Sequence, residues 1–204
     1  MEASKVTLSD AELALAMDPQ VMVMKNAVVD AVYGLFGRVV ERQREILSPL
    51  RPRFGEVFDL PPKISRGEKY RGLPYVMLDH PRSFTPQDIL AVRTLFWWGH
   101  FFSVTLHLRG RWLERFEPGI LASRARWAAG GFHVSTGAQE WEHHFGADNY
   151  TPVESFSEEE WGRGLSDPGF VKLALHHPIS RFGEMEDLLL EGFRDALEIL
   201  HLSL

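Results

Sequence analysis

Apolar residues recur at helical spacing near both ends of the chain. Between Gln20 and Leu47 they return every three or four positions, which is the period of an amphipathic helix. Residues 181–202 repeat this pattern, with Phe182, Met185, Leu189, Phe193, Ala196 and Leu200 along one stripe. The pattern therefore predicts long N-terminal and C-terminal helices. Ser9 or Asp10 can cap a further short helix, which predicts a helical extension over residues 1–18.

Glycine interrupts the first long helix at two positions, Gly34 and Gly37. Each weakens an exposed helix by roughly 1 kcal/mol relative to alanine. We therefore expect either a close packing partner or a bend at this point.

The middle of the chain alternates apolar and polar residues, which is the period of a strand. The segments LPYVMLD (73–79), FHVST (132–136) and FVKLALHHPI (170–179) predict three strands. The aromatic segment LFWWGHFFSVTLHL (95–108) predicts a central strand from Trp98 onward, with Phe102, Val104 and Leu106 facing the core. By the same alternation His100 lies on the apolar side, which favours a core histidine over a catalytic base.

Other segments predict helices or loops. Thr85 as a cap and Pro86 at the first helical position predict a helix over TPQDILAVRT (85–94). The glycine-rich and proline-rich segment PPKISRGEKYRGLP (61–74) indicates a surface loop. Short helices are expected over residues 111–116 and 120–129, and a helical turn capped by Ser157 is expected within SFSEEEWGRGL (155–165). The segment EWEHHFG (140–146) fits either a strand or an irregular segment. The element order predicts a single α+β domain over residues 1–204, with a mostly antiparallel sheet and helices packed mainly on one face.

Composition narrows the class of protein. The chain has 204 residues, no cysteine and a net charge of −6, which excludes disulfides, zinc–thiolate sites and iron–sulfur clusters. The N-terminus lacks a secretory pattern and the aromatic segment is interrupted by polar residues, so we expect a cytoplasmic protein without a membrane span. The acidic balance and the absence of a basic–aromatic repeat disfavour nucleic acid as a partner.

Charge is unevenly distributed. Residues 63–126 hold 11 Lys/Arg and 5 Asp/Glu, whereas residues 137–204 hold 4 and 14. Two interpretations follow: the basic and acidic regions face each other or are simply solvated, or the basic region binds an anion.

The first candidate site is the basic segment KISRGEKYRG (63–72). Its cations and one tyrosine could hold a phosphate or carboxylate, helped by backbone N–H groups near Gly67 and Gly72. The residues are Lys63, Arg66, Lys69, Tyr70 and Arg71. An ordinary solvated turn is the alternative, and the pattern is not that of a phosphate-binding P-loop.

The second candidate is a set of histidines on the polar sides of three predicted strands. If those strands are neighbours in register, His107, His133 and His176 would converge as a three-nitrogen metal site. The alternative is that they are scattered strand histidines, since no HExxH motif is present. Sequences for a serine nucleophile elbow and for dinucleotide binding are also absent.

The segments GEKYRGLPYVMLD and RTLFWWGHFFSVTLHL resemble an uncharacterised bacterial protein family, and their order is similar to that of the YktB-like proteins, which have no assigned activity. The likeness spans residues 38–200 in element order and residues 63–109 in sequence. It implies a single α+β domain and transfers no catalytic residue.

Three functions remain open from the sequence. The favoured one is binding of a small anionic ligand or a protein partner through the basic segment and the polar strand face. The others are a metal-dependent enzyme using the histidines, and a structural or self-associating module, for which the apolar helix VMVMKNAVVDAVYGLF (21–36) is the surface to suspect. No cofactor is identified. Whether the polar sheet face is open or covered by residues 137–165 decides between a surface and a pocket.

Overall fold

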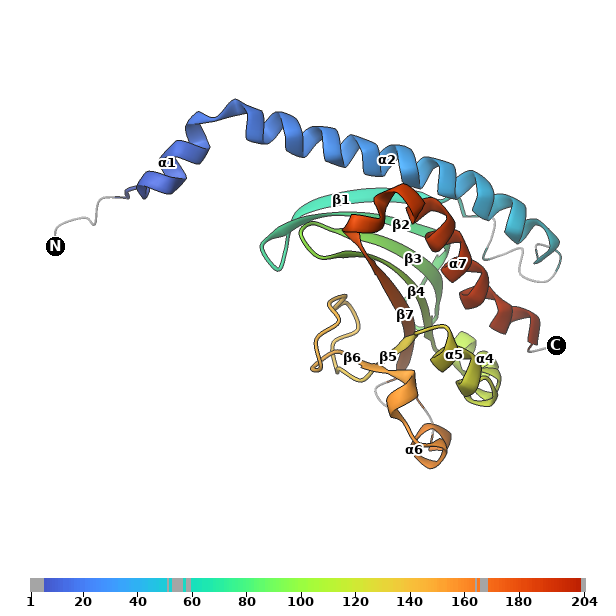
Figure 1. The fold of residues 1–204 in the computed structure, drawn as a ribbon. Helices are drawn as coiled ribbons and strands as arrows, with labels where there is room; N and C mark the ends of the chain where they lie inside the picture. Colours follow the sequence, from blue (N-terminus) through green and yellow to red (C-terminus); the bar gives the residue numbers. More distant parts are fainter. Residues whose placement is uncertain are drawn as a thin grey trace.

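The protein folds as an α+β structure in which helices cover one face of a curved antiparallel sheet (Figure 1). The computed structural model describes residues 6–50, 52, 57, 60–163, 165 and 169–202, without the side chains of residues 199–202. The seven strands lie in the order β1-β2-β3-β4-β7-β5-β6. Their bounds are β1 Lys63–Tyr70, β2 Leu73–Phe84, β3 Ile89–Trp97, β4 Phe101–Arg109, β5 His133–Ser135, β6 Tyr150–Pro152 and β7 Phe170–Pro178.

Three helices begin at a residue whose side chain caps the first turn. Ser9 and Ser157 each form a capping box with the glutamate three residues later, and Asp18 caps the long helix that begins at Pro19. The helices in the described part of the chain are α1 Asp10–Met17, α2 Pro19–Leu47, α4 Arg111–Ala122, α5 Arg124–Ala129, α6 Glu158–Gly162 and α7 Met185–Leu202. None of them is both long and apolar enough to cross a membrane.

The main core lies between the sheet and helices α2 and α7, which cross the same face (Figure 1). Alternate side chains of β4 point into this layer, where the ring of Phe102 meets that of Phe36 from α2 at a centroid distance of 6.3 Å. Arg38 of α2 and Glu186 of α7 join the two helices at 2.6 Å on the outer side. The predicted fold class and both long terminal helices are therefore confirmed, although Leu200 lies outside the residues whose side chains are described.

Two predictions are wrong, because the structure has strands where the sequence predicts a loop and a helix. The segment predicted as a loop over residues 61–74 contains the edge strand β1 and its tight turn to β2. Its lysines and arginines are typical of an edge strand, where charge discourages pairing with another chain. The segment predicted as a helix over residues 85–94 is a turn followed by β3. The Thr85 hydroxyl accepts the N–H of Asp88 at 2.8 Å, so the residue expected to cap a helix closes a hairpin turn instead.

The central strand predicted from Trp98 onward is confirmed as β4, which begins at Phe101 and has Phe102, Val104 and Leu106 in the core. The residues before it were expected to end a helix, and here the structure differs, because the segment belongs to a hairpin. Its strands β3 and β4 are joined by a turn over residues 98–100, and Gly99 has a positive φ of 75° that a side chain would oppose. His100 is consequently exposed in this turn, with its ring stacked 3.6 Å from that of Trp97, and is not the predicted core histidine.

Gly34 and Gly37 have no packing partner that requires glycine. A Cβ atom at either position would meet no atom within 4 Å, and α2 continues through both as one helix. The expectation that close packing explains them is wrong.

Candidate functional site

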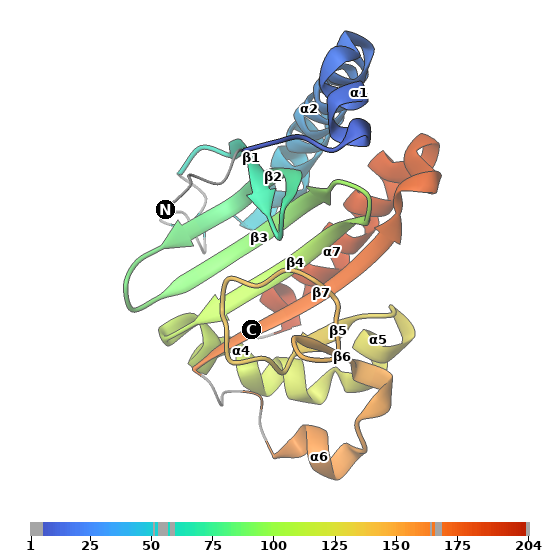
Figure 2. The same ribbon diagram turned by 90° about the vertical axis from the view of Figure 1, so that its left-hand side faces the viewer.

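Residues 136–149 form an irregular segment between β5 and β6 that lies over β4 and β7, on the sheet face opposite the helices (Figure 2). The N–H groups of Thr136 and Gly137 both donate to the carbonyl of Asn149, at 2.9 and 3.2 Å, so the two ends of the segment are held together. A compact loop closed in this way is typical of an Ω-loop. We call residues 136–149 the covering loop. The polar face is therefore covered in part. The segment EWEHHFG (140–146) is neither helix nor strand.

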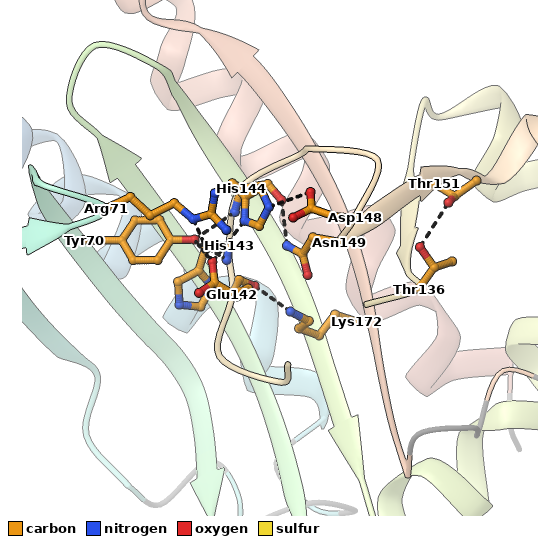
Figure 3. A network of polar contacts seen from close by, with 10 residues as sticks. All are labelled: Tyr70, Arg71, Thr136, Glu142, His143, His144, Asp148, Asn149, Thr151 and Lys172. Atoms are coloured by element: carbon orange, nitrogen blue, oxygen red, sulfur yellow. Dashed lines mark hydrogen bonds and ion pairs between the residues drawn. The ribbon is translucent and has the colours of Figure 1, made fainter. Parts of the chain in front are cut away.

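Tyr70, at the end of β1, anchors the middle of the covering loop (Figure 3). Its hydroxyl oxygen accepts the N–H groups of His143 at 2.7 Å and His144 at 3.0 Å, and its O–H donates to Glu142 at 2.9 Å. Arg71 donates to the same Glu142 oxygen at 3.0 Å. One tyrosine thus satisfies two loop N–H groups that would otherwise lack a partner.

A second set of contacts stiffens the loop from within. The imidazole of His144 lies between two carboxylates, with Nδ1 3.0 Å from Glu142 and Nε2 3.0 Å from Asp148. The side-chain amide of Asn149 donates to the carbonyl of His144 at 2.6 Å. These bonds fix the loop in one conformation above the sheet (Figure 3).

Lys172 supports the loop from the sheet below it. This β7 side chain is 1% exposed and donates from Nζ to the carbonyl of Glu142 at 2.6 Å. Burial lowers the pKa of Lys172 to about 8, and the positive charge of Arg93 acts in the same direction.

A buried ion pair lies beside Lys172. Arg93 of β3 donates to both carboxylate oxygens of Asp79 on β2, at 2.7 and 3.1 Å. Arg93 also approaches Nε2 of His143 at 3.4 Å. Burial, followed by the charge of Arg93, holds the pKa of His143 well below its usual range, so the imidazole is neutral near pH 7.

A pocket of about 400 Å³ lies where the covering loop meets strands β1, β2 and β3. Its wall is mostly aromatic and apolar, and its polar groups come from β1 and from the loop. The lining residues are Gly67, Glu68, Lys69, Tyr70, Tyr75, Met77, Leu95, Trp141 and His143. This volume lies in the range of sites that hold small molecules.

Of the two charged side chains that line the pocket, one has an ion-pair partner and the other does not. Glu68 forms an ion pair with Lys25 of α2, whereas no described carboxylate pairs with Lys69. The lining therefore carries one cation whose charge is not balanced by a described neighbour.

The structure divides the predicted basic site into three parts. Lys69 and Tyr70 line the pocket. Arg71 is committed to Glu142, and Lys63 and Arg66 are exposed on the edge strand outside the lining. Gly67 forms no anion-binding turn, because it lies within β1 where a Cβ atom would be 2.4 Å from the ring of Tyr75.

The three predicted histidines share one sheet face but do not converge. The rings of His133 and His176 lie 5.7 Å apart, but His107 pairs in register with Lys172 while His176 pairs with Ser103, four residues along the same strand. The Nε2 of His107 faces Glu140 at 3.0 Å. Burial lowers the pKa of all three. In the described ranges no group of three His, Cys, Asp or Glu residues is placed to hold a metal ion.

The basic and acidic regions of the chain do face each other. Arg71, Arg109 and Arg126 form ion pairs with Glu142, Glu140 and Asp195, respectively. The first interpretation of the charge distribution thus accounts for three basic side chains.

Sequence reasoning missed most of the pocket, notably Tyr75, Met77, Leu95, Trp141 and His143. A signal for the first two exists, because Tyr75 and Met77 alternate with the core residues Val76 and Leu78 and therefore face away from the helices. For Trp141 and His143 the local pattern gives no regular element. Comparison of the chain with protein-family models, curated proteins and solved structures found no match. The likeness to YktB-like proteins stays a prediction.

Proposed function

We propose that the protein binds a small molecule that combines a flat apolar group with an acidic group, and that it does so in the pocket beneath the covering loop. The observation that carries this proposal is the combination of an aromatic wall with an unbalanced cation, Lys69, in one pocket of about 400 Å³.

The apolar part of the ligand follows from the wall. Tyr75, Met77 and Leu95 line the pocket from the sheet, and Trp141 lines it from the loop. Planar aromatic side chains in the lining favour a flat ring over a bulky or strongly hydrated group.

The acidic part follows from charge. Because Lys25 already balances Glu68, Lys69 is available to a carboxylate or phosphate. His143 adds a neutral donor: with Nε2 accepting from Arg93, the proton of the ring resides on Nδ1. A neutral N–H and a lysine together suit an anion.

The test is isothermal titration calorimetry of the full chain with matched probes. Indole-3-acetate and indole-3-acetamide share the ring and differ at the end of the side chain, which is a charged carboxylate in one and a neutral amide in the other. Acetate and inorganic phosphate lack the ring. We expect the acid to bind more tightly than the amide, and the ring-free anions to bind weakly. Lys69→Gln should lower affinity for the acid by roughly tenfold, the effect of one charge-assisted hydrogen bond, and leave the amide unchanged.

Two further variants locate the site. Met77→Trp fills the pocket and should abolish binding of both indoles. Lys63→Gln, on the same strand outside the lining, is the matched control and should bind as the wild type does. Absence of binding by any ring-containing acid at millimolar concentration, or binding that survives Met77→Trp, would overturn the proposal.

A further inference from the structure

The sheet face beneath the covering loop holds three basic side chains on two neighbouring strands. His107 and Arg109 lie on this side of β4, because side chains two positions apart in a strand share a face. Lys172 of β7 pairs in register with His107 and reaches the underside of the loop (Figure 3). In the described chain no carboxylate forms an ion pair with Lys172, whose Nζ donates to a backbone carbonyl instead. The face therefore contains a buried ammonium group without a counter-charge of its own.

A carboxylate from the covering loop lies against these basic groups. Glu140 Oε1 is 3.0 Å from Nε2 of His107, and Glu140 Oε2 accepts from Arg109 at 3.1 Å. The hydrogen bond with His107 lowers the pKa of Glu140, and the charges of Arg109 and Lys172 act in the same direction against the opposing effect of burial. Both oxygens are thus held by side chains of β4, as basic side chains hold the oxygens of a bound anion.

The charges of this cluster do not cancel. His107 is 3% exposed and burial lowers its pKa, so its ring is neutral near pH 7 and donates its one N–H from Nε2. Arg109 is charged, and Lys172, with a pKa of about 8, is mostly charged at pH 7. Two cations therefore face the single negative charge of Glu140. A dianion in the place of this carboxylate would balance the cluster, whereas a monoanion would not.

Solvent reaches the cluster from one side. The side chain of Arg109 is 38% exposed and that of Glu140 is 13% exposed, so the Glu140 carboxylate can turn outward while the rest of the loop stays in place. The aromatic pocket of the proposed function is a different site, because His107, Arg109 and Glu140 are not in its lining.

We propose that His107, Arg109 and Lys172 form a second binding site, for the phosphate group of a small phosphate monoester, and that Glu140 occupies this site as an internal substitute until the ligand displaces it. A phosphate group carries about −1.5 to −2 charges at pH 7 and has three acceptor oxygens, which matches two cations and one neutral donor. The carboxylate supplies half of that charge, so it holds the loop in place and competes with the ligand.

The test is isothermal titration calorimetry of the full chain and its Glu140→Gln variant. Glutamine keeps the size of the side chain and can still bond to Arg109, but it removes the competing charge. The probes are methyl phosphate, inorganic phosphate and acetate. We expect both phosphates to bind Glu140→Gln at least tenfold more tightly than the wild type, and acetate to gain less. Glu154→Gln, which removes an equal charge outside the covering loop, is the matched control and should bind as the wild type does.

Two double variants locate the gain in affinity. Arg109→Gln changes a partly exposed side chain, and in the Glu140→Gln background it should lower phosphate affinity by about tenfold. Met77→Trp fills the aromatic pocket, and in the same background it should leave phosphate binding unchanged. Failure of the aromatic pocket to bind indoles and failure of this second site are therefore distinguishable.

Nuclear magnetic resonance of the histidine rings reports the contact directly. In Glu140→Gln, methyl phosphate should shift the ring signals of His107 and leave those of His133 in place. Phosphate affinity equal to that of the wild type, or a gain that survives Arg109→Gln, would overturn the proposal. An equal gain for acetate would overturn the assignment to a dianion, and a gain for inorganic phosphate alone would overturn the monoester in favour of the free ion.

Discussion

The hydroxyl oxygen of Tyr70 lies 2.7 Å from the backbone nitrogen of His143, 73 residues further along the chain. This contact joins the end of an edge strand to the middle of the covering loop. The closed pocket wall depends on it, because the same hydroxyl also holds the N–H of His144 and the carboxylate of Glu142.

Tyr70→Phe should therefore loosen the covering loop. The change leaves two N–H groups without their acceptor, and we expect a loss of 1–3 kcal/mol, roughly, in the free energy of unfolding. Hydrogen exchange should accelerate at the amides of His143 and His144. Tyr75→Phe is the control, since the Tyr75 hydroxyl bonds to no described residue. Equal exchange rates in the two variants would show that Tyr70 does not anchor the loop.

Arg93→Met should destabilise the protein strongly. It leaves the Asp79 carboxylate, which is 6% exposed, without its bidentate partner, and breaking a buried pair costs about 3–5 kcal/mol. Urea denaturation measures the loss. Arg163→Met breaks the exposed pair with Glu159 and should change stability little. Similar losses for the two variants would contradict the buried role assigned to Arg93.

Stability should fall as pH drops from about 6.5 to about 4, in part because of His80. This side chain is buried against Gln43, with its Nδ1 3.0 Å from Oε1, and burial lowers its pKa to about 4. Between the two values the unfolded chain binds a proton that the folded chain does not, so unfolding is favoured by up to roughly 3 kcal/mol. Below about pH 4 both states bind the proton, so the full loss of roughly 3 kcal/mol has been reached and His80 lowers stability no further.

Proton NMR of the His80 ring in the folded protein measures this midpoint directly. His80→Gln should also make the dependence of the unfolding free energy on pH less steep, although the buried His107 and the half-buried His143 still contribute with the same sign. A His80 midpoint near 6.5 would contradict the prediction.

Alanine should have opposite effects at two glycines. At Gly37 the new methyl group meets no neighbour and improves helix propensity, so Gly37→Ala should stabilise the protein by about 1 kcal/mol. At Gly67 the methyl group would lie 2.4 Å from the end of the Tyr75 ring, which must move aside, so Gly67→Ala should destabilise the protein by about 1 kcal/mol, the low end of the cost of overpacking. Thermal and urea unfolding measure the change in unfolding free energy for each variant. A change of the same sign in both would contradict the packing at these two glycines.

The helices were predictable from the sequence because their period and their caps agree. Pro19–Leu47 carries both an apolar stripe and a capping aspartate at Asp18, and Ser157 with Glu160 forms the box that its pattern indicates. The strands β1 and β3 were missed because local signals pointed elsewhere. Thr85 and Pro86 are as suitable for a hairpin turn as for a helix start, and pairing with β2 and β4 decided the outcome.

The site was predictable only in part for the same reason. Lys69 and Tyr70 could be singled out by residue type, but their relation to Trp141 and His143 depends on how an irregular loop folds back over the sheet. The spacing of apolar residues along the chain does not indicate how this loop folds back over the sheet. For the histidines, the shared face followed from alternation, whereas the distance of His107 from His176 depends on strand register, which a single sequence does not specify.

Helix α2 begins outside the body of the protein and ends inside its core, without interruption. Its first buried residue is Val29, and the 29 residues of the helix span about 44 Å at the usual rise of about 1.5 Å per residue. The helix is rigid, because it runs without a break from the exposed Met22 to Phe36, which packs against Phe102 of the sheet. Any molecule that binds the first turns of α2 is therefore held in a fixed orientation relative to the sheet.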